Sequence, residues 1–147
     1  SKEHRLLAPQ AGAMGAGVPA ALAAKSIYPN RQVICFAGDG DFQMSASELG
    51  TAMQEGLNPI ILIHNNGSYG TIRMHQEMRY PKRVSGTNLK NPNFKCIAEA
   101  YNFGYSKITN LNEFKVAFEK AKTIDVGFII EMLADIKDIS PGKIIDL

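Results

Sequence analysis

The sequence has no tryptophan, only two cysteines and no strong excess of either charge. Its 147 residues include 16 Lys and Arg against 14 Asp and Glu, so the formal net charge is +2. Nucleic-acid-binding proteins carry dense basic clusters, and the densest basic stretch here, Arg73–Arg83, is interrupted by Glu77. Nucleic acid is therefore a poor first hypothesis for a partner.

Long apolar runs are also missing. The longest, Ala16–Ala24 and Pro59–Ile63, fall well short of the roughly 20 residues that a membrane-spanning helix needs. The two cysteines, Cys35 and Cys96, are far apart and form no CxxC pair, which argues against a disulfide scaffold and suits a reducing compartment. We therefore expect a cytoplasmic protein without a membrane partner, of a length that suits one domain.

Short apolar runs alternate with helical patterns along the chain. Strands are predicted at Gln32–Ala37, Pro59–His64, Tyr105–Ile108 and Val126–Leu133, and helices at Gly15–Tyr28, Ser45–Glu55, Thr71–Tyr80, Asn93–Asn102 and Leu111–Lys122. Ser45 and Glu48 have the form of a capping box, which predicts a helix start at Ser45 with a loop before it. Residues 83–92 are predicted to form an exposed loop. This alternation indicates an α/β fold of three layers, with helices on both faces of a mostly parallel sheet.

Polar residues follow two of the predicted strands. Gly38-Asp39-Gly40-Asp41 follows the first strand and Asn65-Asn66-Gly67 the second. Ligands of such sheets bind at the carboxyl ends of the strands, so Asp39 and Asn66 face one pocket if the strands are neighbours. Mg²⁺ takes hard oxygen ligands and completes its shell with phosphate oxygens, and the flanking glycines and the helix predicted after Asp41 would suit an anion. The pattern predicts a Mg²⁺-diphosphate site; the alternative is that both motifs are simple tight turns.

Three blocks in this order resemble those of thiamine-diphosphate enzymes. Gly38-Asp39-Gly40 is followed, after 24 residues, by Asn65-Asn66, which is similar to the signature of that family. The segment Ala11–Ala21 resembles acetolactate synthases, and Asn65–Arg73 resembles benzoylformate decarboxylases. The resemblance covers nearly the whole chain. It implies that residues 1–147 form one C-terminal thiamine-diphosphate-binding domain with the fold of that family.

The resemblance also implies metal and cofactor ligands. The side chains of Asp39 and Asn66 and the backbone carbonyl of Ser68 match the Mg²⁺ ligands of the family. The cofactor-binding positions that match are Gly12 and Met14 at the aminopyrimidine, Gly38, Gly40 and Asp41 at the diphosphate, and Gly70 and Thr71 closing over it. The Met14 side chain matches the bulky residue that props the cofactor into its bent form.

A few single residues need a decision between function and packing. Thr71, Ile72 and His75 match the stretch that lines the substrate side in the family, although a surface position is an equal alternative for His75. His64 ends an apolar strand and is expected to be a satisfied core histidine. Glu48 is expected to cap a helix. Asp41 stands where Ser or Ala is commoner, and only a backbone contact is expected there.

One part of the family's active site has no counterpart in this sequence. The glutamate that protonates the pyrimidine ring comes from a separate pyrimidine-binding domain, so the catalytic residue stays unknown here. We expect the chain, which begins at Ser1, to be a fragment or a split subunit of a larger oligomeric enzyme, and to be inactive alone. The implied activity is decarboxylation of a 2-oxo acid such as pyruvate, with transfer of the acyl carbanion to an acceptor. The alternatives are a benzoylformate-type decarboxylase, a non-catalytic Mg²⁺-phosphate module and, third, a nucleotide-binding Rossmann domain.

Overall fold

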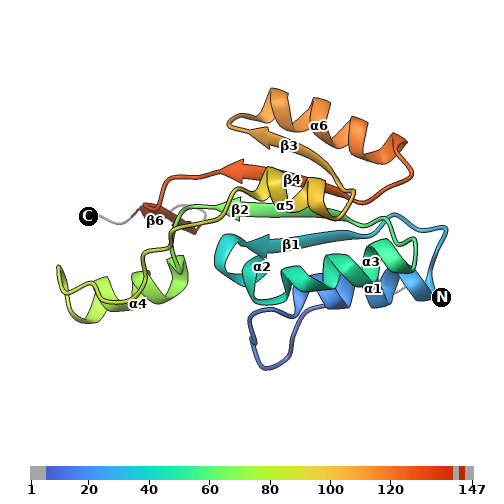
Figure 1. Cartoon of the computed structure of the whole chain (residues 1–147). Coiled ribbons are helices and arrows are strands. Elements are labelled where there is room, and N and C mark those ends of the chain that lie inside the picture. The colour runs from blue at the N-terminus through green and yellow to red at the C-terminus, as the bar shows by residue number, and fades with distance from the viewer. Residues whose placement is uncertain (1–5, 141–142, 145–147) are drawn as a thin grey trace.

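Four parallel strands form the central sheet of the computed structural model, which describes residues 6–140, 143 and 144 (Figure 1). They are β1 (Ile34–Gly38), β2 (Ile60–Asn65), β3 (Gly104–Ile108) and β4 (Phe128–Leu133), in the order β1-β2-β4-β3. Each strand lies within about two residues of its prediction, the usual uncertainty of an element's end. Because β1 and β2 are neighbours, the two polar motifs meet at one edge of the sheet.

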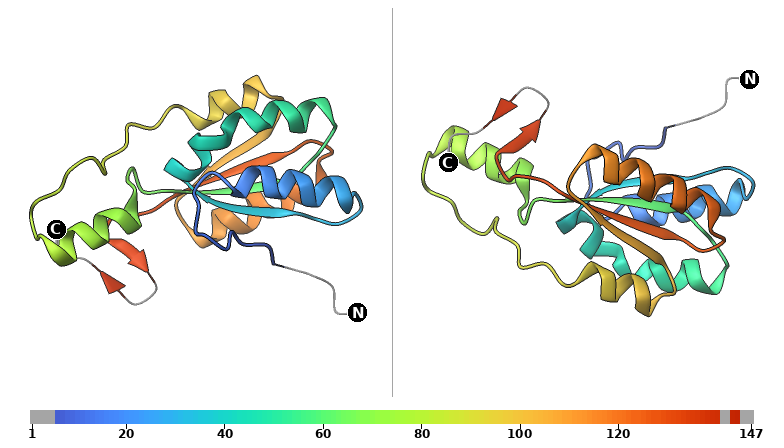
Figure 2. Two further views of the ribbon diagram at one scale, coloured as in Figure 1. Left: turned by 90° about the horizontal axis from the view of Figure 1, so that it is seen from below. Right: turned by 90° about the horizontal axis from the view of Figure 1, so that it is seen from above.

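Helices cover both faces of this sheet (Figure 2). Helices α1 (Gly17–Ile27), α2 (Asp39–Ser45), α3 (Leu49–Gln54) and α5 (Phe94–Ala100) share one buried cluster with Cys35, Ala37, Ile61, Ile63 and Ile129 of the strands. Helix α6 (Leu111–Thr123) packs on the other face, against Ile60, Leu62, Phe128 and Ile130. Successive strand residues point to opposite faces, which is why alternate positions enter alternate clusters. The predicted three-layer α/β fold is confirmed.

The first helix after β1 begins earlier than the sequence indicates. Helix α2 starts at Asp39, so the predicted loop is helical, and a 3-10 turn at Ala46–Glu48 separates it from α3. Burial of Phe42 favours this early start: Phe42 is fully buried, and its ring meets that of Phe94 edge to face, with the ring centroids 5.6 Å apart. The predicted capping box is wrong, because Ser45 makes no side-chain cap bond and the Glu48 carboxylate accepts from the Thr51 hydroxyl instead.

The connection between α4 (Gly70–Arg79) and α5 is more ordered than an exposed loop. Thr87 is buried, and its carbonyl accepts from the Tyr69 N–H at 2.9 Å and the Ser68 hydroxyl at 2.8 Å. Leu89 donates its N–H to the Gly67 carbonyl at 2.8 Å. The prediction for residues 83–92 is therefore wrong in part: backbone bonds to residues 67–69 hold the second half of this segment beside the end of β2.

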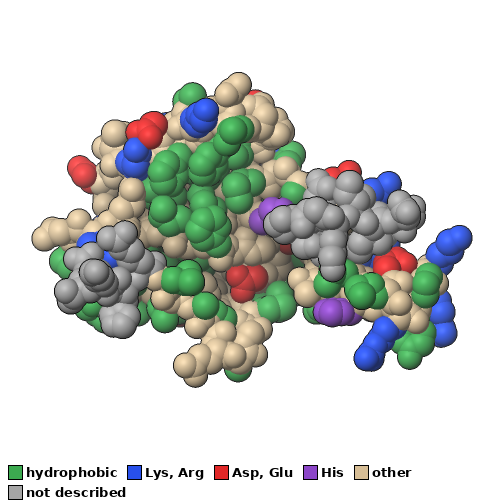
Figure 3. All heavy atoms as spheres, turned by 180° about the vertical axis from the view of Figure 1, so that it is seen from behind, with side chains coloured by type: hydrophobic (Ala, Val, Ile, Leu, Met, Phe, Trp, Pro, Cys, Tyr) green, Lys and Arg blue, Asp and Glu red, His purple; other side chains and the backbone are tan. Residues whose placement is uncertain are grey.

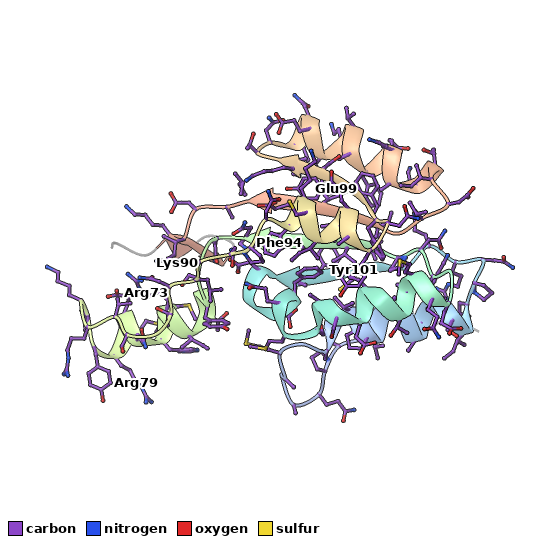
Figure 4. The ribbon with its side chains drawn as sticks, viewed as in Figure 1. Arg73, Arg79, Lys90, Phe94, Glu99 and Tyr101 are labelled. Carbon is purple, nitrogen blue, oxygen red and sulfur yellow. The ribbon has the colours of Figure 1, made fainter. Side chains whose placement is uncertain are left out.

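Helix α4 stands apart from the rest of the molecule. None of its residues is buried, and Figure 4 shows its Arg73 and Arg79 away from the sheet, whereas Phe94 and Tyr101 lie by α5 near α2 and α3. An antiparallel pair not foreseen from the sequence, β5 (Asp138–Ser140) and β6 (Lys143–Ile144), lies beside α4. In the described part of the chain, every helix is too short or too polar to cross a bilayer.

One part of the sheet keeps an apolar surface. Ile34 and Phe36 alternate with the buried Cys35 and Ala37, and they are 39% and 75% exposed. Their register partners on β2 are Ile60 and Leu62, so they extend the face on which α6 packs. Figure 3, which views the molecule from behind, shows apolar side chains gathered on that side.

The two cysteines are free and differ in exposure, which predicts different reactivity. Burial, and then the charge of Asp41, raises the pKa of the Cys35 thiol from 9.0 to about 12. At pH 8 we expect a thiol reagent to modify the exposed Cys96 quickly and Cys35 only after unfolding, because the thiolate is the reactive form. The folded state favours the protonated thiol, because the pKa of Cys35 is higher in the folded than in the unfolded chain. Its contribution to the free energy of unfolding is therefore complete below pH 9 and is lost as the pH rises from about 9 to about 12.

Counting modified thiols with and without denaturant tests this difference. One fast thiol in the folded protein is expected, and none in a Cys96→Ser variant. Two fast thiols in the folded protein would contradict it.

Candidate functional site

A cavity of about 590 Å³ opens where β1 and β2 end. It is lined by Gly12, Met14, Gly38, Asp39, Gly40, Asp41, His64, Asn66, Ser68, Tyr69, Gly70, Thr71 and Ile72. Every metal- and cofactor-binding position proposed from the sequence lies in this lining. Its size is that of a small-molecule site, and its place is the one expected for open parallel sheets.

Asp39 is held at the cavity by three hydrogen bonds. The residue is 2% exposed. The Oδ1 atom accepts from the Gly40 N–H at 3.0 Å, and Oδ2 accepts from the Gly67 N–H at 2.9 Å and the Asn91 amide at 2.6 Å. A carboxylate has about four acceptor positions, so one position, on Oδ1, remains for another partner such as a cation.

Two neutral oxygens accompany this carboxylate. The Asn66 Oδ1 atom accepts from the Ser68 N–H at 3.0 Å, and the Ser68 carbonyl accepts from the Gly70 N–H at 2.9 Å. Each of these oxygens keeps a second lone pair. A Cβ atom at Gly70 would lie 2.8 Å from the Asn66 amide nitrogen, so glycine is needed there for the turn to close.

This donor set fits Mg²⁺. In the described residues, no three His, Cys, Asp or Glu side chains converge on a possible metal site. A cation at this cavity would therefore depend on the Asp39 carboxylate, neutral oxygens and oxygens of its own ligand. Mg²⁺ binds in this manner, with one or two carboxylates, waters and phosphate oxygens.

The first asparagine of the pair has a different position from the second. Asn65 lies outside the cavity lining, and its Oδ1 atom accepts from the Gly67 N–H at 3.2 Å and the Asn91 amide at 2.8 Å. Its Nδ2 group donates to the Glu131 carboxylate at 2.7 Å. Both lone pairs of its carbonyl are in use, so Asn65 shapes the turn and Asn66 faces the cavity.

Glu131 was not among the candidate residues, although it is a buried carboxylate beside the site. It is 4% exposed, accepts a hydrogen bond from the Tyr105 hydroxyl, and lies 3.5 Å from the Lys107 ammonium. Burial raises the pKa of Tyr105, and the hydrogen bond and charge of Glu131 raise it further. The sequence offers no signal for this cluster, because its members come from three strands.

The Asp41 side chain joins the N-terminal loop to α2, in addition to the backbone contact with the diphosphate that the resemblance implies. Its Oδ1 atom accepts from the Gly15 N–H at 2.5 Å. Gly15 has a φ of +81°, a conformation that side chains disfavour, so glycine allows the loop to turn toward Asp41. This bond fixes the segment that carries Gly12 and Met14 at the cavity, where Met14 is 42% exposed.

His64 and His75 have different positions: only His64 of the two lines the cavity, and His75 takes the surface position that was its alternative. His64 is exposed and lines the cavity, so its assignment to the core is wrong: it lies near the end of β2, beyond the buried Ile60–Ile63. His75 is exposed on α4 and is not part of the cavity lining, unlike Thr71 and Ile72. The run of apolar residues in β2 does not show at which residue the strand stops being buried.

Tyr69 is another cavity residue that the sequence analysis did not single out. A Cβ atom at Gly40 would lie 2.4 Å from the Tyr69 Cε1 atom. The second glycine of the Gly38–Gly40 motif is therefore required by packing against Tyr69.

Comparisons with known proteins agree with this geometry. The family model described as "Thiamine pyrophosphate enzyme, C-terminal TPP binding domain" matches residues 1–132. The chain belongs to this family. Its fold is thus that of a thiamine-diphosphate-binding domain.

Similar curated proteins are acetolactate synthase large subunits. The one from Buchnera aphidicola subsp. Schlechtendalia chinensis is 46% identical over 99 residues, covering 67% of this chain and 17% of that protein. The one from Cyanidium caldarium is 33% identical over 139 residues, covering 90% of this chain and 24% of that protein. The chain thus spans about a fifth of the length of these relatives.

A solved structure is also similar. The thiamine diphosphate-dependent 4-hydroxybenzoylformate decarboxylase of Rhodococcus jostii RHA1 matches with a TM-score of 0.79 and 30% identity. The match covers 85% of this chain and 24% of that one.

Proposed function

We propose that the chain binds thiamine diphosphate through Mg²⁺ at the β1–β2 cavity, as part of an acetolactate-synthase-like enzyme. The cavity itself carries the proposal, because it brings Asp39, Asn66 and Ser68 together with the loop of Gly12 and Met14. Each of the three oxygen donors keeps an acceptor position for a cation. The family to which the chain belongs supports the identity of the cofactor.

We expect the diphosphate to bind N–H groups in the first turns of α2 and α4. The Gly40 and Gly70 N–H groups already donate to Asp39 and Ser68. The N–H groups of Asp41 and Thr71 lie in the first turns of α2 and α4, where helices leave N–H groups without intrahelical partners. We therefore assign most of the diphosphate binding to Asp41 and Thr71.

The other cavity residues shape the ends of the site. When bound, thiamine diphosphate supplies the nucleophilic carbon and the electron sink for decarboxylation of a 2-oxo acid. Met14 would support the cofactor from the N-terminal loop, and Thr71 and Ile72 would border the substrate. His64 lines the same cavity and replaces His75 as the histidine proposed for the substrate side.

The complete enzyme needs more than this chain. The relatives are about four times longer, since 99 matched residues are 17% of one relative and 139 are 24% of the other. We propose that a pyrimidine-binding domain, of the same or another chain in an oligomer, supplies the glutamate that acts on the cofactor. The substrate of the assembled enzyme is a 2-oxo acid such as pyruvate, and the acyl carbanion passes to an acceptor.

A second candidate function is 2-oxo acid decarboxylation of the benzoylformate type. The similarity to the decarboxylase structure is consistent with it, without favouring it over the first candidate. Product analysis distinguishes the two functions: the first gives a ligation product from pyruvate, and the second gives an aldehyde from benzoylformate.

Calorimetric titration of the protein with thiamine diphosphate, with and without Mg²⁺, tests the proposed function. We expect saturable binding that requires Mg²⁺, little competition by ADP, and no turnover of pyruvate until a pyrimidine domain is supplied. Preferential binding of ADP would indicate a nucleotide-binding domain instead. Cofactor binding without turnover, even with that domain present, would indicate a non-catalytic module.

A further inference from the structure

Asn91 lies outside the motifs of the sequence, yet it contacts both motifs of the site. It is half-buried in the connection between α4 and α5, directly after Lys90, which Figure 4 labels where this connection passes the sheet. Its Nδ2 group donates to the Asp39 Oδ2 atom at 2.6 Å and to the Asn65 Oδ1 atom at 2.8 Å. One side-chain amide thus links the carboxyl ends of β1 and β2.

Other contacts fix the orientation of this amide. The Gln43 side chain on α2 donates to the Asn91 Oδ1 atom at 2.9 Å. The backbone bond from Leu89 to the Gly67 carbonyl, at 2.8 Å, holds the preceding residues beside the turn. Because the carbonyl and both hydrogens of the amide have partners, a flipped or rotated Asn91 would lose hydrogen bonds.

Asn65 is equally fixed from its other side. Its Nδ2 group donates to the buried Glu131 carboxylate at 2.7 Å, so its Oδ1 atom must face Gly67 and Asn91. The partners Asp39, Asn91, Asn65 and Glu131 therefore form one row across β1, β2 and β4.

We propose that Asn91 is a positioning residue, whose amide holds the Asp39 carboxylate against the Asn65–Gly67 turn so that Oδ1 faces the Mg²⁺ of the cofactor. This proposal rests on the proposed function. The Gly67 and Asn91 donors occupy Oδ2 and leave the free acceptor position on Oδ1. An amide suits this task, because it donates hydrogen bonds without the positive charge with which Lys or Arg would repel a cation.

The test is Asn91→Leu, which keeps the number and branching of the side-chain heavy atoms and removes the amide's hydrogen-bond donors and its acceptor. Partners of metal ligands typically change metal affinity by about 10–100-fold. We expect the Kd for Mg²⁺, measured calorimetrically with excess thiamine diphosphate, to rise by at least about tenfold. Cofactor binding should return to the wild-type stoichiometry at saturating Mg²⁺, which a variant that merely lost part of its folded population would not show.

Asn93→Ala is the matched control. Asn93 lies two residues further along the same connection and caps α5, where its side chain accepts from the Cys96 N–H at 3.2 Å. We expect this variant to melt at a lower temperature and to keep the wild-type Kd for Mg²⁺.

Three results would overturn the inference. An Asn91→Leu protein whose Kd for Mg²⁺ is within twofold of wild type shows that Asn91 does not position Asp39. A loss of cofactor binding that saturating Mg²⁺ fails to restore shows the same. Wild-type protein that binds no cofactor refutes the proposed function itself. If Asn91→Leu does not fold, Asn91→Ser is judged by the same criteria, since its single hydroxyl hydrogen can serve only one of the two acceptors.

Discussion

Replacing Asp39 by alanine is expected to abolish Mg²⁺-dependent binding of thiamine diphosphate. Asp39 is the carboxylate with three fixed hydrogen bonds and a remaining acceptor position at the cavity. The other two proposed donors, Asn66 and Ser68, are neutral. Without the charged ligand, the remaining protein ligands compensate poorly for the water molecules that Mg²⁺ loses on binding. We expect the Kd for Mg²⁺ in the presence of the cofactor to rise at least about 100-fold, a change of about 2.8 kcal/mol.

The measurement is calorimetric titration, with circular dichroism to show that the variant is folded. Asp125→Ala is a suitable control, because Asp125 is exposed and lies outside the cavity lining. It should bind like wild type. Asp39→Ala protein that is folded and binds the cofactor with unchanged Mg²⁺ dependence would refute the assignment of the metal ligand.

Replacing Glu131 by alanine is expected to cause a large loss of stability, although Glu131 lies outside the apolar core. Glu131 is 4% exposed and accepts hydrogen bonds from Asn65 and Tyr105. Its removal leaves both donors without an acceptor in a part-buried region, and each such group costs about 1–3 kcal/mol. We expect the free energy of unfolding to fall by about 2–4 kcal/mol, as measured by urea denaturation.

Lys107→Ala is the matched control for Glu131. The Lys107 ammonium lies 3.5 Å from the same carboxylate, but the Lys107 side chain is 51% exposed. Exposed partners of ion pairs contribute about 0–1 kcal/mol, because water replaces the lost interaction. An equal loss of stability in both variants would show that the ion pair, and not the buried hydrogen bonds, stabilises this cluster.

Both predictions concern residues in one row of hydrogen bonds, but only one of the two residues was recognisable in the sequence. Asp39 follows a clear strand and lies in a motif with glycine on both sides, so its place at a strand end could be predicted. Glu131 lies within an apolar strand, and in the sequence it looks like any single polar residue in such a strand. Its partners are 66 residues away, at Asn65, and 26 residues away, at Tyr105. No local pattern relates such positions.

The errors of the sequence analysis have a similar cause. Ser45 and Glu48 form a correct local capping pattern, yet the helix starts at Asp39, because Phe42 packs against Phe94 from another part of the chain. His64 continues an apolar run, yet the cavity begins before the strand ends. In each case a tertiary contact outweighed a local preference.

The sequence by itself determined the α/β alternation, the polar motifs at two strand ends and the family resemblance, since all three depend on residues close together in the chain. Only the tertiary structure decided that β1 and β2 are neighbours, that Asn65 faces Glu131 while Asn66 faces the cavity, and that Asn91 joins the two motifs. These facts depend on the strand order β1-β2-β4-β3 and on side-chain directions. Such contacts form when distant segments pack together, and hydrophobic periodicity carries no information about them.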